Sequence, residues 1–213
     1  PSPKQSPPTD LPDPPTRRAR SPFGSYNEFS GTTYTIDDCQ CSPGYFGGGG
    51  ADCTACPSGH YTSEFGSTSE SACVKALKVC MMFPTYETVS GVYSQLHSIF
   101  AGALSGIAEV NDKSDAMWDD LLPDTTIFYE WYNDGNDGAT GMKVAVECVT
   151  TAFGGTAADA VIGPSYSGVA MSTQLILASY GVPQISHSAT SPTLSDAVTY
   201  PTFFRTPPSV GAA

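Results

Sequence analysis

The chain has 213 residues, of which 21 are Asp or Glu and 9 are Lys or Arg, so its formal net charge is -12 at pH 7. This excess of negative charge repels nucleic-acid phosphates and anionic lipids, which argues against a nucleic-acid-binding function. No run reaches the roughly 18 apolar residues of a membrane helix, because the longest candidate, residues 98–110, is interrupted by Gly102, Gly106 and Glu109. The sequence begins at Pro1, so we expect any signal peptide to have been removed or to lie outside it.

Residues 1–38 are rich in Pro, Ser and Thr and contain a basic cluster of Arg17, Arg18 and Arg20. Such a composition cannot bury a core, so the sequence predicts a disordered leader with local polyproline II character. We interpret the basic cluster as a solvated run of charge in a flexible tail. A processing or docking site is the alternative.

Five of the seven cysteines fall within residues 39–74. This density in a Gly-rich stretch is typical of disulfide-stapled extracellular modules and indicates an oxidising compartment. The order Cys, Pro, Gly, aromatic occurs twice, from Cys41 and from Cys56, so the segment is an internal repeat. The repeat pairs Cys41 with Cys53 and Cys56 with Cys73.

The cysteine-rich segment resembles the ephrin-receptor-like repeat of extracellular proteins. A zinc site that uses Cys53 and Cys56 is the alternative, but the repeat places each cysteine in its own turn unit rather than in two matched CxxC pairs. Cys39 has no upstream partner, so we expect it to bond Cys80 or to make an intermolecular contact. We interpret Cys80 and Cys148 as small buried hydrophobic residues rather than as ligands or nucleophiles.

After the cysteine-rich segment, short apolar runs alternate with amphipathic stretches. Residues 77–83 form an apolar run of strand length, and residues 89–110 have apolar side chains at helical spacing. Residues 125–131 alternate and are rich in aromatic and β-branched side chains, which predicts a second strand. The turn-rich residues 133–141 (NDGNDGATG) lead into a second helix. The residues predicted to share one face of this helix are Met142, Ala145, Cys148, Val149 and Ala152.

The pattern continues with a third strand at residues 160–163 and a third helix at residues 169–180, which Gly181 ends. A fourth strand follows at residues 182–186, and residues 202–205 begin a fifth. Strands that alternate with helices predict an α/β fold with a partial, doubly wound parallel sheet and helices on both faces. We expect residues 75–213 to hold this domain in incomplete form.

Two polar segments follow predicted strands. Residues 163–168 (GPSYSG) precede a helix, whose unpaired N–H groups and dipole favour an anion. Residues 186–191 (SHSATS) offer hydroxyls and carbonyls that can hold an ammonium or a neutral polar group. Ligands of open parallel sheets bind beyond the carboxyl ends of the strands, so together the segments predict a site for a small zwitterion. The structural alternative is that Ser165 and Ser167 cap the helix and residues 188–192 form a self-capped turn.

The stretches 161–170 (VIGPSYSGVA), 182–196 (VPQISHSATSPTLSD) and 200–209 (YPTFFRTPPS) resemble the first lobe of the Venus flytrap domain of family C G-protein-coupled receptors, the metabotropic glutamate and GABA type B receptors. The resemblance extends back to Leu77. It implies a periplasmic-binding-protein-like lobe without enzymatic activity, cofactor or metal, which binds an amino acid or similar zwitterion and signals by lobe closure. It also implies an extracellular location at the cell membrane, a receptor dimer, and a heterotrimeric G protein that acts through a region outside this chain.

In that family, the hydroxyl residue that opens the third helix and the one after the fourth strand bind the carboxylate and amino groups of the ligand. The resemblance assigns these roles to Ser167 and Thr190. The remaining residues of the expected site are Gly168, Ser188, Ala189, Tyr166 and His187. Tyr166 stands where metabotropic glutamate receptors have a small residue, and His187 where an aromatic residue is frequent, so the identity of the ligand stays open.

Two other function classes compete with a receptor. A serine hydrolase would use Ser165, His187 and Asp196, but residue 167 is not the Gly that a nucleophile elbow requires, and the chain order of the three residues differs from that fold. A non-catalytic adhesive or structural surface protein is the second alternative. Family C receptors carry their cysteine-rich module after the flytrap domain, whereas here it comes first, which implies a different architecture.

Overall fold

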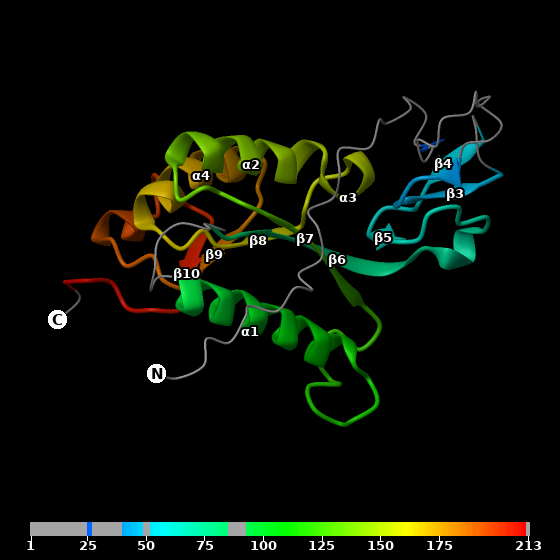
Figure 1. The fold of residues 1–213 in the computed structure, drawn as a ribbon, viewed down its shortest axis with the longest axis horizontal. Coiled ribbons are helices and arrows are strands. Elements are labelled where there is room, and N and C mark those ends of the chain that lie inside the picture. The colour runs from blue at the N-terminus through cyan, green and yellow to red at the C-terminus, as the bar shows by residue number, and fades with distance from the viewer. Residues whose placement is uncertain (1–24, 27–39, 49–51, 85–92, 212–213) are drawn as a thin grey trace, which may run out of the picture.

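The structure is a computed structural model that describes residues 25–26, 40–48, 52–84 and 93–211. Its larger part is a sheet with helix α1 on one face and helices α2 and α4 on the other (Figure 1). A small cysteine-rich unit lies at one end of the long strand β6 (Figure 1). The α/β class that the alternating pattern predicts is therefore confirmed.

The elements of the larger part are, in chain order, β6 (Val74–Met82), α1 (Tyr93–Asn111), β7 (Thr126–Tyr132), α2 (Gly138–Thr150), α3 (Ala152–Gly155), β8 (Ala160–Ile162), α4 (Ser167–Ser179), β9 (Gln184–Ser186), the 3-10 helix η3 (Pro192–Ser195) and β10 (Phe203–Arg205). The parallel strands lie in the order β10, β9, β8, β6, β7. The chain leaves β6 toward β7 and returns on the other side to form β8. The switch in strand order, where such sheets open a crevice beyond their carboxyl ends, is therefore between β6 and β8.

The five predicted strands correspond to β6 to β10, with shifted boundaries. Helix α2 is also where the pattern places it, but one residue of its predicted buried face is wrong, because Met142 is exposed. The neighbouring Gly141 is buried instead, and a Cβ atom there would lie 2.5 Å from Val169 Cγ1 of α4. The close approach of the two helices at Gly141 turns Met142 toward solvent. Residues 89–92 of the predicted first helix lie outside the described residues.

Cys80 and Cys148 are both fully buried, but they are bonded to each other and so link β6 to α2. The predicted burial of these two residues is confirmed, but the disulfide between them was not predicted. The first alternative for Cys39, a bond to Cys80, is wrong because Cys80 already has a partner; Cys39 itself lies outside the described residues, so its intermolecular alternative stays a prediction. Packing of the helix on the sheet brings the two Cα atoms to 5.8 Å across a sequence separation of 68.

The cysteine-rich unit contains β2 (Gln40–Cys41), β3 (Tyr45–Gly47), β4 (Cys53–Ala55), β5 (His60–Tyr61) and the 3-10 helix η2 (Glu70–Ala72). Its bonds Cys41–Cys53 and Cys56–Cys73 confirm the pairing that the repeat predicts and exclude the zinc alternative for these cysteines. Strand β1 (Ser25–Tyr26) pairs with β2, so two residues of the predicted disordered leader have regular structure. The other leader residues, including the basic cluster, lie outside the described residues.

The cysteine-rich unit shares a core with the sheet. Strand β5 pairs antiparallel with the beginning of β6. The buried Tyr61 ring packs edge-on against Phe128, at 5.0 Å between ring centroids, and against Phe153, at 5.6 Å. Gly154 has a φ of +74°, and a Cβ atom there would lie 2.2 Å from the Pro43 carbonyl oxygen, so only glycine permits this contact. The predicted boundary between residues 74 and 75 falls inside β6.

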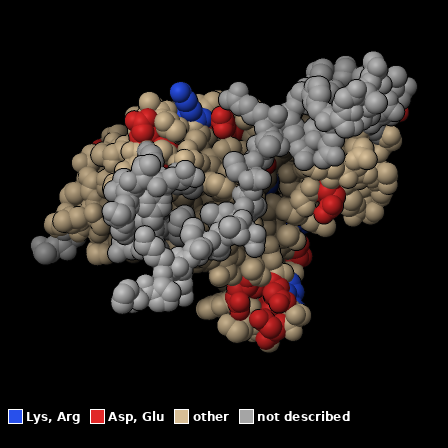
Figure 2. Space-filling model, viewed as in Figure 1, with Lys and Arg blue, Asp and Glu red and all other residues tan. Residues whose placement is uncertain are grey.

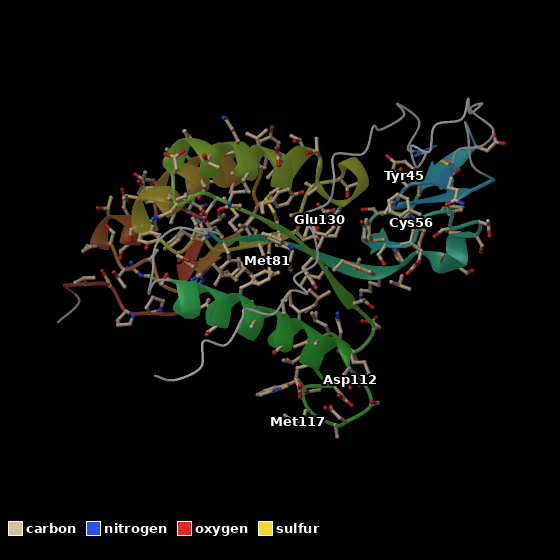
Figure 3. The ribbon with its side chains drawn as sticks, viewed as in Figure 1. Tyr45, Cys56, Met81, Asp112, Met117 and Glu130 are labelled. Carbon is tan, nitrogen blue, oxygen red and sulfur yellow. A yellow bond between two sulfur atoms is a disulfide. The ribbon has the colours of Figure 1, made fainter. Side chains whose placement is uncertain are left out.

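A carboxylate at the end of β7 supports this junction. Glu130 Oε1 accepts a hydrogen bond from the Phe153 backbone N–H at 3.1 Å, and its other oxygen accepts one from the Tyr132 hydroxyl at 2.6 Å. Figure 3 shows Glu130 on the sheet, between Met81 and the cysteine-rich unit, which is marked by Tyr45 and Cys56. Among the described residues, no helix combines the length and the apolar character that crossing a membrane requires.

Candidate ligand-binding site

The two polar segments of the sequence lie side by side at the carboxyl edge of the sheet, because β8 and β9 are paired. Side-chain hydrogen bonds join the segments beyond the strands. The Ser186 hydroxyl donates to the Pro164 carbonyl and the Ser188 hydroxyl donates to the Ser165 carbonyl, both at 2.7 Å. The folding of the chain therefore brings together the residues that the sequence predicts as one site.

Ser167 and Thr190 lie at the centre of this convergence. Ser167 is the first residue of α4, and its half-buried hydroxyl accepts a hydrogen bond from the Ser191 backbone N–H at 3.1 Å. Thr190 is the residue before Ser191, so it is held against the start of α4. The half-buried Thr190 hydroxyl makes no hydrogen bond with the residues that the structure describes, which leaves it free for a ligand.

The start of α4 carries no side-chain cap. Tyr166 occupies the N-cap position, and its side chain makes no capping hydrogen bond. The alternative in which Ser165 or Ser167 caps this helix is therefore wrong. The N–H groups of the first turn and the positive end of the helix dipole stay available for an anion beside Ser167. Tyr166 and Gly168, on either side of Ser167, are exposed.

The turn after β9 is held by a buried hydroxyl. Ser186, which is fully buried, accepts hydrogen bonds from the backbone N–H groups of Ser188 at 3.4 Å and Ala189 at 3.0 Å. A hydroxyl-capped turn is thus present, but Ser186 caps it rather than a residue of the 188–192 turn in the structural alternative, and Ser188 is exposed. The Ala189 methyl group packs in a small buried cluster with Ala170, Leu194 and Tyr200. Ala189 therefore anchors the loop by packing.

His187 joins the ends of three strands. Its ring stacks on the buried ring of Phe83, just beyond β6, with 5.2 Å between centroids and 17° between planes. The Nε2 atom lies 3.0 Å from the Ser165 hydroxyl. Burial lowers the pKa of His187, so the ring is neutral at pH 7. Its buried Nδ1 atom has no hydrogen-bond partner among the described residues.

The hydrolase hypothesis is wrong because Asp196 does not join Ser165 and His187. Ser165 and His187 are in hydrogen-bond contact, but the exposed Asp196 is engaged elsewhere. Its carboxylate accepts hydrogen bonds from the Val198 N–H at 3.0 Å and the Thr199 hydroxyl at 2.7 Å. No carboxylate of the described residues therefore orients His187 Nδ1 as a catalytic triad requires. Ser165 is also only 7% exposed, which closes its hydroxyl to a substrate.

Sequence reasoning missed three supporting residues. Phe83 ends a predicted strand without polar neighbours, Ser186 is one of several hydroxyls in its segment, and Arg205 lies in the last predicted strand. Arg205 donates to the Ser191 carbonyl at 2.8 Å and to the Ser195 hydroxyl, which ties β10 to the site loop. The position of each directly after or within a strand that ends at this edge is the signal that could have identified it.

Known proteins resemble this chain in sequence and in fold. Residues 115–213 match the family model described as the receptor family ligand binding region. Over these residues the chain is similar to receptor ligand-binding regions. Taste receptor type 1 member 3 of Homo sapiens is 32% identical over 116 residues, which are 48% of this chain and 13% of the receptor. The Canis lupus familiaris receptor of the same name is 29% identical over 133 residues, or 56% of this chain and 15% of the receptor. The chain thus spans a small part of the length of these relatives.

A solved structure shows the same fold. The branched-chain amino acid transporter substrate binding protein LivJ of Streptococcus pneumoniae, in complex with isoleucine, superposes with a TM-score of 0.51 at 21% identity. The superposition covers 63% of this chain and 34% of LivJ. The matched proteins are receptors and a transport binding protein rather than enzymes. The narrower resemblances to metabotropic glutamate and GABA type B receptors, and to the ephrin-receptor-like repeat, stay predictions.

Proposed function

We propose that this chain is part of the extracellular ligand-binding region of a cell-surface receptor that binds an amino acid or a similar small zwitterion. One observation carries the proposal: the uncapped start of α4, at Ser167, lies against the loop that holds Thr190, at the carboxyl edge of the sheet. The family match supports a receptor. The isoleucine in the complex of LivJ supports an amino acid as the ligand class.

The chemistry of the two segments fits opposite ends of a zwitterion. The dipole and the N–H groups of α4 would hold the carboxylate together with the Ser167 hydroxyl. The hydroxyls of Thr190 and Ser188 would accept from the ammonium group. The neutral imidazole of His187 adds no buried positive charge that would repel the ammonium.

Signalling is the less direct part of the proposal. A second lobe outside this chain would close on the ligand and contribute the rest of the binding energy, so the ligand would shift the receptor toward the closed state. Dimerisation of the receptor and coupling to a heterotrimeric G protein, through regions outside this chain, complete the proposal. For this chain alone we expect weak binding or none.

A calorimetric panel of amino acids, measured with a longer chain that includes the second lobe, tests the ligand class. Each of Ser167→Ala and Thr190→Ala should lower the affinity of any amino acid that binds by about 10-fold or more, since a hydrogen bond to a charged group is worth roughly 1.5–3 kcal/mol. Thr193→Ala, an exposed threonine on η3, is the matched control and should leave the affinity unchanged. Affinity that survives both site substitutions contradicts the assigned site. Failure of every amino acid to bind favours the adhesive or structural alternative.

A further inference from the structure

The loop between α1 and β7, residues 112–124, displays large apolar side chains to solvent. The exposed fractions of its apolar residues are 54% for Met117, 58% for Trp118, 46% for Leu121 and 38% for Leu122. Large apolar side chains that gather on a surface mark interaction sites, and Trp and Met are enriched in protein interfaces. Figure 3 shows Met117 and Asp112 on this loop, where it extends away from the sheet.

The loop has a defined conformation that keeps these side chains outward. The Leu121 N–H donates to the Trp118 carbonyl, and Lys113 Nζ donates to the Leu121 carbonyl, both at 2.8 Å. Ala116, Trp118 and Leu122 have φ values of 65°, 60° and 52°. Residues other than glycine adopt this left-handed region at an energetic cost and persist there only where their surroundings hold them. The apolar side chains are therefore presented by a folded loop.

The charge of the loop decides what kind of partner fits. It contains five Asp residues and one Lys. Asp124 pairs with Lys75 at 2.9 Å, while Lys113 donates to backbone carbonyls. The loop carboxylates that form no ion pair with a described residue are Asp112, Asp115, Asp119 and Asp120. Figure 2 shows the acidic side chains gathered on this part of the surface. A positively charged partner is attracted here and a negatively charged one is repelled.

The loop lies apart from the ligand-binding site. It leads into the amino end of β7, and the Lys75–Asp124 ion pair ties it to the amino end of β6, whereas Ser167 and Thr190 follow the carboxyl ends of strands. A partner on this loop would therefore contact the receptor at the edge that carries the cysteine-rich unit and would leave the ligand crevice open.

We propose that residues 112–124 are a docking surface for a protein partner that presents a positively charged segment with apolar side chains. The Lys or Arg residues of the partner pair with the loop carboxylates, and its apolar side chains cover Trp118 and Met117. The proposal does not rest on the proposed ligand-binding function, because it uses neither the ligand nor the carboxyl edge of the sheet.

Fluorescence anisotropy with a labelled amphipathic Lys/Leu peptide tests the proposal, with a Glu/Leu peptide of the same pattern as the reference. The chain should bind the first peptide and not the second. The double variant Met117→Ser, Trp118→Ser should weaken binding by about 10-fold or more. The double variant Asp115→Asn, Asp120→Asn should weaken binding and reduce its dependence on salt.

Matched variants elsewhere distinguish peptide binding at the loop from nonspecific hydrophobic binding and from an effect of the net charge. Leu175→Ser with Tyr180→Ser removes two comparably exposed apolar side chains of α4 and its end, and Glu64→Gln with Glu147→Gln removes the same charge from other surfaces. Both should leave the affinity unchanged, and thermal unfolding verifies that each variant is folded. Equal losses in loop and control variants, or no binding of the Lys/Leu peptide, would overturn the proposal.

Discussion

The two edges of the sheet are stabilised by different kinds of interaction. At the amino edge, two disulfides hold the cysteine-rich unit together, and strand pairing and the packing of Tyr61 join that unit to the sheet. At the carboxyl edge, short hydroxyl side chains join the loops after β8 and β9. Two titratable groups also follow strands at this edge, the half-buried His187 after β9 and the buried Asp134 after β7. We therefore expect the amino edge to depend on redox state and packing, and the carboxyl edge to depend on pH.

The largest expected effect comes from the disulfides. In the chain-entropy account, a bond that closes a longer loop stabilises the fold more. Replacing Cys80 and Cys148 by Ala, across a separation of 68, should cost about 4 kcal/mol of unfolding free energy. Replacing Cys56 and Cys73, across a separation of 17, should cost about 3 kcal/mol. Urea unfolding measures both, and a larger cost for the shorter loop would contradict this order.

The next effect concerns the junction of the two parts. Tyr61→Ala removes the ring that packs on Phe128 and Phe153, which should cost roughly 3 kcal/mol as a large-to-small substitution in a core. Amide hydrogen exchange should then become faster in β5 and in the first residues of β6. The neighbouring His60→Ala, which changes an exposed side chain of the same strand, should leave exchange unchanged. Equal protection in both variants would show that the unit is held by other contacts.

A buried carboxyl group should make the carboxyl edge sensitive to pH. Asp134 is only 1% exposed, and burial raises the pKa of its carboxyl group to about 6. The folded state therefore holds the proton of Asp134 more tightly than the unfolded state does. The contribution of Asp134 to stability is thus present near pH 4 and is lost as the pH rises through about 6. Asp134→Asn keeps the acceptor for the Asn136 N–H and removes the buried charge. It should gain on the order of 2 kcal/mol at pH 7 and little near pH 4, as measured by chemical unfolding.

The smallest expected effect comes from His187, whose contribution to stability depends on pH in the opposite direction to that of Asp134. Burial lowers the pKa of His187 below its usual 6.5, so the folded state disfavours the protonated ring. The contribution of His187 is complete above about pH 6.5 and is lost as the pH falls below that value. His187→Phe keeps a ring to stack on Phe83 but leaves Ser165 without its partner, which should cost roughly 1 kcal/mol at pH 7. The variant should also lose stability less steeply below pH 6.5 than the original chain, as chemical unfolding at several pH values measures.

Much of this fold is readable from local patterns. Alternating apolar runs and helical spacing predicted the order of strands and helices, and the repeated cysteine phrase predicted Cys41–Cys53 and Cys56–Cys73. The polar segments at strand ends were predicted to converge, because the carboxyl ends of parallel strands meet at one edge. Whether Ser167 and Thr190 bind a ligand there stays a prediction.

The features that were not predicted depend on contacts between distant residues. Nothing local distinguishes the bonded Cys80 and Cys148 from buried hydrophobic residues, since each lies in an apolar pattern of its own element. The turn sequence around Asp134 resembles any exposed polar turn, yet this side chain is buried in the folded chain. Tyr61 belongs by sequence to the cysteine repeat, yet its ring completes the core of the larger part.

Strand β6 connects the cysteine-rich unit with residues of the candidate site. This strand of nine residues pairs with β5 at its start and ends next to Phe83, whose ring rests on His187. One continuous strand thus connects the unit with the ring that contacts His187. If the proposed lobe closure tilts the sheet, the cysteine-rich unit moves with it, because the two share this strand.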